Sequence, residues 1–439
     1  MTLSLAFPES DRYCLRQARV PQAVLDNCGG LGRPDPEGSF LLDLSIEAGR
    51  ITAIAPTSSS PSDALSLDLQ GRQLWPGFID IHTHLDKGHI WLRSPNPDGS
   101  FEGALATAIA DSSQHWTPDE LLARMDFSLR CAYAHGTVAL RTHLDSAGEL
   151  AAQGFAVFQE LRQRWSDRLT LQAASLVSLD HYQGAAGERL ADLVAEAGGL
   201  LGGVTFPSPQ LDEQLDRLLD LARDRQLDLD LHVDESLEPS DRTLQQVAAA
   251  VQRKGFTGKV LCGHCCSLSV QPEAELPIQL QAVQAAGLGI VSLPLCNSYL
   301  QDRQTGRTPR LRGIAPVQEI RTAGIPLCLS SDNTRDPFYA YGDLDMVEVF
   351  RESVRIGQLD HPWLPWPAAV TCTPADWMGL VDQGRIAIGA RADFVIFNAR
   401  SFTELLARPQ SDRLIVRNGR AIAPKLPDYA ELDAVLTRH

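Results

Sequence analysis

Histidines and an aspartate stand at the carboxyl ends of apolar runs that lie far apart in this 439-residue chain. The set comprises His82, His84, His143, His232, His264 and Asp332. His82 and His84 close the same run, and alternate residues of a strand share one side, so their imidazoles would point the same way. A third imidazole and a carboxylate would then complete a site for Zn²⁺, Fe²⁺ or Mn²⁺.

A metal ion held in this way, with one open position, supports hydrolytic chemistry. Such an ion lowers the pKa of a bound water to about 7 and so supplies hydroxide at neutral pH. Glu235 follows His232 by three residues, where the chain leaves the apolar run, and is placed to carry protons to a substrate. The pattern predicts metal-assisted hydrolysis of a small molecule.

The stretch 73–384 contains the elements that must position these residues. Short apolar runs alternate there with longer amphipathic stretches such as 118–134 and 210–224. The strand-like runs are 77–81, 137–142, 169–177, 200–205, 227–231, 259–263, 287–293 and 325–330. This alternation predicts an α/β fold, a (β/α)8 TIM-like barrel, in which the carboxyl ends of the strands meet on one face. No Gly-x-Gly-x-x-Gly follows a strand, which argues against a dinucleotide site.

Both ends of the chain are rich in strand signals. Residues 41–55 form two alternating runs around a glycine, which indicates a hairpin. Near the other end, Asn418-Gly419 is a favoured hairpin turn within the run 414–422. We therefore expect residues 1–72 and 385–439 to form one small β-sandwich domain built from both termini.

Composition and charge narrow the range of partners. The formal net charge of −16 makes the chain a poor binder of nucleic acid and of anionic membranes. No run of 18 apolar residues and no signal-peptide pattern is visible. The nine cysteines are an odd number and scattered, which indicates reduced thiols and a cytoplasmic protein.

These motifs resemble the amidohydrolase superfamily. The segment 76–84, which ends in His-Thr-His, resembles its metal-binding opening. Five further segments resemble the cytosine deaminase branch of this superfamily: 141–145, 232–235, 263–264, 293–303 and 331–337. The resemblance covers most of the chain and implies a metal-dependent aminohydrolase that releases ammonia from a small amino-substituted heterocycle.

The resemblance also implies residue roles. One divalent ion, Zn²⁺ or Fe²⁺ with Mn²⁺ also acceptable, would be held by His82, His84, His232 and Asp332. Glu235 would protonate a ring nitrogen, while His264 and Asp332 would handle the protons of the attacking water and of the leaving ammonia. Residues 203–207 contain no lysine, so a second metal is not expected. Relatives commonly self-associate, so we expect a homo-oligomer.

Two departures from the cytosine deaminase pattern leave the substrate open. Ser178 stands where cytosine-specific relatives have a glutamine, and Asn333 where they have an acid. A site that recognises a ring through hydrogen bonds discriminates by about 10⁴ or more when donors and acceptors change. With these two residues, a different amino-heterocycle is almost as well supported as cytosine. Isocytosine, aminotriazine, creatinine-like and pterin-like rings are the candidates. Lys87 is a further candidate for a substrate contact or, equally, for a loop salt bridge. His143 is a candidate to line the pocket or to hold Asp145 and the loop after the second strand in place.

Two other functions remain compatible with the sequence. The same barrel could cleave a cyclic amide or release an N-alkylamine, and product identity would separate these reactions from deamination. A non-catalytic protein that holds a metal or ligand is the remaining alternative, and the presence of Glu235 beside the ligand set argues against it.

Overall fold

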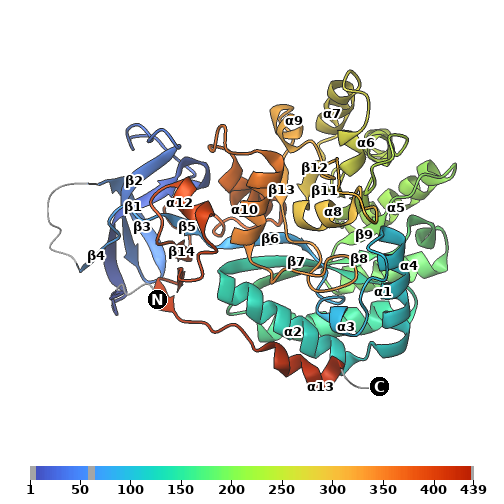
Figure 1. Ribbon diagram of the computed structural model, residues 1–439, viewed down its shortest axis with the longest axis horizontal. Coiled ribbons are helices and arrows are strands. Elements are labelled where there is room, and N and C mark those ends of the chain that lie inside the picture. The colour runs from blue at the N-terminus through green and yellow to red at the C-terminus, as the bar shows by residue number, and fades with distance from the viewer. Residues whose placement is uncertain (1–5, 58–64, 437–439) are drawn as a thin grey trace. The chain divides into compact units, whose positions relative to one another are not determined.

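The computed structural model describes residues 6–57 and 65–436 (Figure 1). The backbone divides into two compact units. The terminal unit comprises the described residues of Met1–Ile79, Ala132–Ala139 and Asp345–Leu426. The central unit comprises those of Asp80–Cys131, Leu140–Leu344 and Pro427–His439. The domain boundaries expected at residues 72 and 385 remain a prediction.

The terminal unit contains two four-stranded sheets. The first has the order β3 (Arg50–Pro56), β2 (Ser39–Glu47), β1 (Arg12–Pro21) and β4 (Ser66–Asp68). The second has the order β16 (Arg420–Ile422), β15 (Leu414–Arg417), β14 (Phe394–Ile396) and β5 (Leu74–Pro76). Its helical segments are η1 (Gln22–Val24), α10 (Met346–Gly357), η5 (Trp366–Val370), α11 (Cys372–Trp377) and α12 (Phe402–Ala407).

Both expected hairpins are present in this unit. Strands β2 and β3 pair antiparallel around a turn in which Gly49 has φ of 74°. Strands β15 and β16 pair antiparallel around Asn418 and Gly419, whose φ values are 47° and 75°. Positive φ at both central residues is the conformation that an Asn-Gly turn favours, because it matches the twist of the flanking strands.

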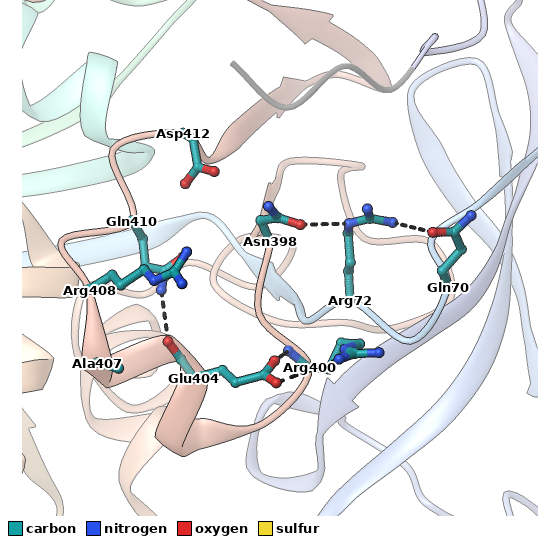
Figure 2. A pocket seen from close by; sticks show the side chains of 9 residues that line it. All are labelled: Gln70, Arg72, Asn398, Arg400, Glu404, Ala407, Arg408, Gln410 and Asp412. Atoms are coloured by element: carbon teal, nitrogen blue, oxygen red, sulfur yellow. Dashed lines mark hydrogen bonds and ion pairs between the residues drawn. The ribbon is translucent and has the colours of Figure 1, made fainter. Parts of the chain in front are cut away.

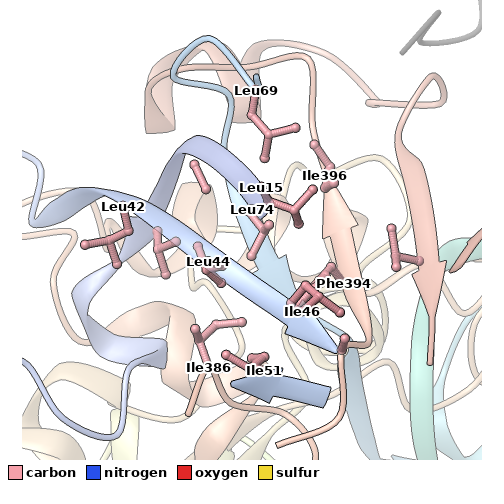
Figure 3. Packing of buried hydrophobic residues seen from close by; sticks show 14 of the residues in the cluster. Leu15, Leu42, Leu44, Ile46, Ile51, Leu69, Leu74, Ile386, Phe394 and Ile396 are labelled. Carbon is pink, nitrogen blue, oxygen red and sulfur yellow. The ribbon is translucent and has the colours of Figure 1, made fainter. Parts of the chain in front are cut away.

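Apolar side chains of the two sheets share one hydrophobic core (Figure 3). Leu15 and Leu44 come from the first sheet, and Leu74, Phe394 and Ile396 come from the second. All five are fully buried. Side chains alternate between the faces of a strand, so the first sheet turns an apolar face inward, whereas β5 and β14 of the second sheet are buried on both faces.

The central unit holds the eight strands expected for the middle of the chain. One sheet has the order β6 (Phe78–Thr83), β7 (Thr137–Asp145) and β8 (Thr170–Leu176), the first two of which begin in residues of the terminal unit. The other has the order β13 (Leu327–Leu329), β12 (Gly289–Ser292), β11 (Val260–His264), β10 (Leu229–Val233) and β9 (Leu201–Val204), all parallel. Isolated parallel bridges join Ala174 to Leu200, Ser178 to Val204 and Thr83 to Asp332.

Helices follow these strands in sequence. They are α1 (Phe101–His115), α2 (Pro118–His135), α3 (Glu149–Arg164), α4 (Ala185–Glu196), α5 (Leu211–Arg225), α6 (Thr243–Lys254), α7 (Leu276–Ala285), α8 (Pro294–Leu300), α9 (Val317–Thr322) and α13 (Asp433–Leu436). Short 3₁₀ turns are η2 (Ile90–Leu92), η3 (Leu179–Gln183), η4 (Cys266–Ser269) and η6 (Tyr429–Leu432). Helices α4 to α7 pack successively against one another outside strands β9 to β12 (Figure 1). Within the described residues, no helix has both the length and the apolar character needed to cross a membrane.

Candidate active site

The histidines predicted from the sequence converge at one end of the strands of the central unit. His82 lies in β6 and His84 follows it, while His143, His232 and His264 lie in β7, β10 and β11. The ring centroid of His82 is 4.1 Å from that of His143, 4.7 Å from that of His232 and 5.5 Å from that of His264. Residues separated by up to 182 positions therefore form one imidazole cluster.

Asp332 joins this cluster through its carboxylate. Its Oδ1 lies 3.2 Å from His84 Nε2 and 3.5 Å from His82 Nε2. His232 Nε2 lies 3.2 Å from the same His84 nitrogen. Three groups of side chains have donor atoms within 4.8 Å of one another: His82, His84, His143 and His232; His82, His264 and Asp332; and Glu235, Cys296 and Asp332. The structure thus brings all four predicted ligands together.

The electrostatics of the cluster suit a cation. Burial, reinforced by the neighbouring imidazoles of the cluster, holds the pKa of His82 and of His232 well below its ordinary value. Burial and the ammonium of Lys87 do the same to the pKa of His84. Neutral imidazole is the form that binds metal. Among the described residues, neither ring nitrogen of His82 and neither carboxylate oxygen of Asp332 has a hydrogen-bond partner. Buried polar atoms are nearly always satisfied, so this donor set fits a divalent cation.

Asp80, which sequence reasoning missed, fixes the segment that carries Asp332. Its carboxylate is fully buried and accepts hydrogen bonds from both Ser330 Oγ and Ser331 Oγ, the latter at 2.6 Å. The backbone N–H of Asp332 then donates to the carbonyl of His82 at 2.9 Å. Burial raises the pKa of Asp80 to about 6, although the serine hydrogen bonds oppose the shift. A sequence signal was available, because Asp80 is an acid two residues before His82 within an apolar run.

Two of the predicted residues adopt an unusual backbone conformation at the ends of their strands. His264 and Asp332 have φ values of 68° and 66°, in the left-handed region that residues other than glycine rarely adopt. Such conformations cluster at functional sites, where the surrounding structure imposes them. Gly263 precedes His264, and a Cβ there would lie 2.9 Å from Cε1 of His82. The glycine therefore leaves room for the His82 ring.

Glu235 lies beside His264 at the edge of the cluster. Its Oε1 is 3.3 Å from His264 Nδ1, and the side-chain N–H of Asn297 donates to that nitrogen at 2.9 Å. Burial, together with the nearby carboxylate of Asp332, raises the pKa of Glu235 well above its ordinary value. A carboxyl group in this environment holds its proton, as a general acid must. Asn297 was not identified from the sequence, since nothing in its segment distinguishes it.

The cluster opens into a cavity of about 370 Å³. The predicted residues that line it are His84, Lys87, Ser178, His232, Glu235, His264, Asp332 and Asn333. His82 and His143 are fully buried and are not among its lining residues, so His143 lies within the cluster and not on the cavity wall. Asn333 donates to the Asp336 carboxylate at 2.7 Å, which fixes its amide. The remaining wall is mainly apolar, with Phe101, Leu105, Phe206 and Phe338 on it.

Asp230, a second acid missed from the sequence, lies beneath the cluster. Its Oδ1 is 3.2 Å from His143 Nε2, and its Oδ2 accepts a 2.7 Å hydrogen bond from Arg141. The Arg141 guanidinium also donates to Gln172 Oε1. Like Asp80, Asp230 precedes a cluster histidine by two residues within a strand, which is a signal that a second reading of the sequence could use.

We expect Arg141→Met to lower the free energy of unfolding by about 3–5 kcal/mol. The variant removes one partner of a fully buried ion pair and leaves the Asp230 charge without its guanidinium. The measurement is urea unfolding followed by circular dichroism. Arg164→Met is the control, because Arg164 and Glu160 are about half exposed and should contribute under about 1 kcal/mol. Equal losses in the two variants would contradict the buried-pair argument.

His89 supports a prediction about pH. It is 1% exposed, and burial, with a smaller contribution from Arg335, lowers its pKa to about 3. Between about pH 6.5 and 3 the unfolded imidazole is protonated and the folded one is not, so stability falls as the pH falls through this window. Between pH 7 and pH 5 the free energy of unfolding of the wild type should fall by about 2 kcal/mol more than that of His89→Asn. Asparagine suits the left-handed φ of 69°.

Urea unfolding of wild type and variant at pH 7 and pH 5 measures this difference. His361→Asn serves as control, because the His361 side chain is 92% exposed. If the free energy of unfolding of His89→Asn fell as much as that of the wild type between pH 7 and pH 5, the His89 imidazole would be protonated in the folded protein at pH 5.

The terminal unit has a cavity of different character, of about 390 Å³ (Figure 2). Arg72 donates to Asn398 and Gln70 across it, each at 3.1 Å, and Glu404 accepts from the backbone N–H of Arg400 (Figure 2). Its described lining residues include no histidine or cysteine, and its polar groups largely bind one another. Three of the four candidate metal ligands line the cavity of the central unit, and none is among the described residues that line this one.

Comparisons with known proteins identify the family to which this chain belongs. A model of the amidohydrolase family matches residues 66–197 and 120–423. A pterin deaminase of Rhizobium rhizogenes is 49% identical over 430 residues, 98% of each chain. An N-isopropylammelide isopropyl amidohydrolase of a Pseudomonas species is 24% identical over 88% of this chain and 94% of its own.

Solved structures share the fold. The 5-methylcytosine deaminase of Klebsiella pneumoniae, crystallised with 5-fluorocytosine, superposes with a TM-score of 0.79 at 21% identity, over 94% of this chain and 98% of that one. The family match spans well over half of the sequence and includes each of the clustered histidines, Glu235 and Asp332. By both its sequence and its fold, this chain is a member of the amidohydrolase family.

Proposed function

We propose that this protein is a metal-dependent deaminase that releases ammonia from an amino-substituted two-ring heterocycle of the pterin type. The observation that carries the proposal is the cavity in which a neutral imidazole cluster, Asp332 and Glu235 meet an apolar, partly aromatic wall. The 49% identity to a pterin deaminase supports the choice of ring. At about 370 Å³, the cavity has room for a two-ring heterocycle.

The proposal includes a closed (β/α)8 barrel and a small β-sandwich. The two sheets of the central unit contain eight strands, and isolated bridges run from β8 to β9 and from β6 to Asp332, which follows β13. These bridges support closure into a ring. The shared core of the two terminal sheets supports a sandwich.

Four side chains would hold the cation: His82, His84, His232 and Asp332. A divalent ion there supplies Lewis acidity and lowers the pKa of water. His264 and Asp332 would take a proton from the attacking water and return it to the departing amine. One water adds to the amino-bearing carbon, the C–N bond breaks, ammonia leaves and a carbonyl remains.

Glu235 would protonate the ring nitrogen beside the amino-bearing carbon. Attack on that carbon pushes negative charge onto the nitrogen, and a carboxylic acid within hydrogen-bond reach neutralises it. The aromatic side chains of Phe206 and Phe338 lie on the wall and suit a planar ring.

The test is ammonia release by metal-loaded protein from pterin, isocytosine, cytosine, 5-methylcytosine, isoguanine, creatinine and ammelide. We expect the highest kcat/KM with pterin and no release by the Glu235→Gln variant. Release of isopropylamine from N-isopropylammelide, with no ammonia from any ring, would replace the proposal by N-alkylamine hydrolysis. No hydrolysis at all, with stoichiometric metal, would favour a binding protein.

A further inference from the structure

Lys87 and Asp145 form an ion pair on the wall of the cavity. Lys87 lies in the turn after β6, and Asp145 is the last residue of β7. The Lys87 side chain is 5% exposed, whereas that of Asp145 is 25% exposed. Both residues line the cavity, so the pair is buried on the protein side and open on the substrate side.

The surrounding contacts hold this pair in place. The backbone N–H of Asp145 donates to Asp86 Oδ2 at 2.7 Å, and Lys87 Nζ lies 3.9 Å from Asp86 Oδ1. The Arg124 guanidinium donates to the backbone carbonyls of Asp86 and Gly88, which fixes the turn. Burial lowers the pKa of Lys87, but the carboxylates of Asp145 and Asp86 outweigh it and raise the pKa above its ordinary value. Lys87 therefore remains an ammonium.

The pair is exceptional in its position on this wall. Apart from the histidines, Glu235 and Asp332, Lys87 and Asp145 are the only charged side chains among the described residues that line the cavity. Their apolar neighbours on the wall include Leu105, Leu150 and Leu176. A buried ion pair is often no more stabilising than apolar residues of similar size, so fold stability gives little reason to place one here.

The pair offers a donor and an acceptor side by side. An ammonium donates hydrogen bonds and an ionised carboxylate accepts them. A lactam edge, a ring N–H next to a ring carbonyl, presents the complementary pattern. We propose that Lys87 and Asp145 bind the lactam edge of the substrate, with Lys87 on the carbonyl oxygen and Asp145 on the ring N–H.

This inference rests on the proposed function and defines its substrate class more closely. The substrate would be a ring in which the amino-bearing carbon lies between a lactam N–H and a second ring nitrogen. Pterin has this arrangement, and cytosine does not, because it lacks a ring N–H between its carbonyl carbon and its amino-bearing carbon. Asp145 would accept a hydrogen bond from the lactam N–H, and Glu235 would protonate the second ring nitrogen.

The test compares pterin with 2-aminopteridine, which keeps the amino group but lacks the lactam. Each variant is scored by its kcat/KM relative to wild type, so the intrinsic reactivities of the two rings cancel. Lys87→Met and Asp145→Asn should each lose about 10²-fold or more on pterin and less than about threefold on 2-aminopteridine. Lys87→Gln, which keeps a neutral donor, should fall between Lys87→Met and wild type. Equal losses on both rings would assign the pair a structural role and overturn the inference.

Binding of the deaminated product, the pteridine dione, gives a readout that does not depend on turnover. Its dissociation constant, measured by fluorescence titration, should rise about 10-fold or more in both variants, and an unchanged constant would also overturn the inference. If wild type binds the dione but releases no ammonia, the proposed reaction fails while the binding test still applies. Arg413→Met is the matched control, because it removes a buried ion pair with Asp345, and neither residue lines the cavity. Melting temperature and metal content identify any variant that fails to fold.

Discussion

Replacing His84 with alanine is expected to abolish both metal retention and turnover. The Nε2 atom of His84 lies 3.2 Å from Asp332 Oδ1 and 3.2 Å from His232 Nε2, so its removal opens the centre of the donor set. A bound cation contributes several kcal/mol of transition-state stabilisation, and each 1.4 kcal/mol is about tenfold in rate. Activity should therefore fall by about 10³-fold or more. Metal per chain, measured by mass spectrometry after dialysis, should fall from near one to near zero.

The control for this experiment is His361→Ala, which removes an exposed imidazole and should leave metal content and activity unchanged. Chelation of wild-type protein should reproduce the loss, and added Zn²⁺, Fe²⁺ or Mn²⁺ should restore activity to wild type but not to His84→Ala. The melting temperature of the variant distinguishes loss of metal from loss of fold. Wild-type metal content in a folded His84→Ala protein would remove His84 from the ligand set.

The strands, and the clustering of the histidines at one end of them, could be predicted from the sequence. Buried parallel strands are short apolar runs, and a chain of alternating strands and helices brings their carboxyl ends to one face. His82, His84, His232 and His264 each stand at such an end, so their order along the chain was enough. The strand bounds differ by a few residues, because hydrogen bonding and not hydrophobicity defines where a strand ends.

The orientation of the site side chains at the strand ends depends on contacts between strands, and these contacts could not be predicted from the sequence. Asp332 is among the residues predicted from the sequence, but the features that hold it at the cluster, its left-handed backbone three residues beyond β13 and the serine hydrogen bonds of Asp80, could not be predicted. The sequence leaves His143 either on the pocket wall or supporting the loop after the second strand, and in the structure its ring packs against His82 within the cluster. Which side of a strand end faces the cavity is set by sheet register and twist, and neither can be read from a single sequence.

The substrate wall was the least predictable part of the site. Phe101 and Leu105 come from α1, a helix that carries no catalytic signature, and Phe206 comes from the loop after β9. Loops and helix faces converge on a cavity through tertiary packing, so spacing along the chain carries little information about them. Of the two roles expected for Lys87, the structure shows the loop salt bridge, and it identifies Asp145 as the partner.

The Glu235→Gln variant should keep its metal and lose turnover by about 10³-fold, within the range for loss of a general acid that also neutralises developing charge. Glutamine has nearly the same shape and still reaches His264, but it cannot give up a proton to the ring nitrogen. The effect should appear in kcat, with a small change in KM, because the proton is needed as the tetrahedral centre forms and not for binding. Steady-state ammonia release together with metal analysis provides both quantities.

The matched control is Glu238→Gln, three residues along the same loop, where the side chain is exposed and lies outside the metal cavity. It should retain turnover within about twofold, because surface substitutions of this kind perturb little. The pH dependence gives a second criterion. Burial and Asp332 raise the pKa of Glu235, so in wild type the acid form persists toward neutral pH and activity should decline as the pH rises above the pKa of this group. That alkaline decline should be absent from the residual activity of Glu235→Gln. If the variant keeps near wild-type turnover, another group must donate the proton, and Glu235 would be a structural partner of His264.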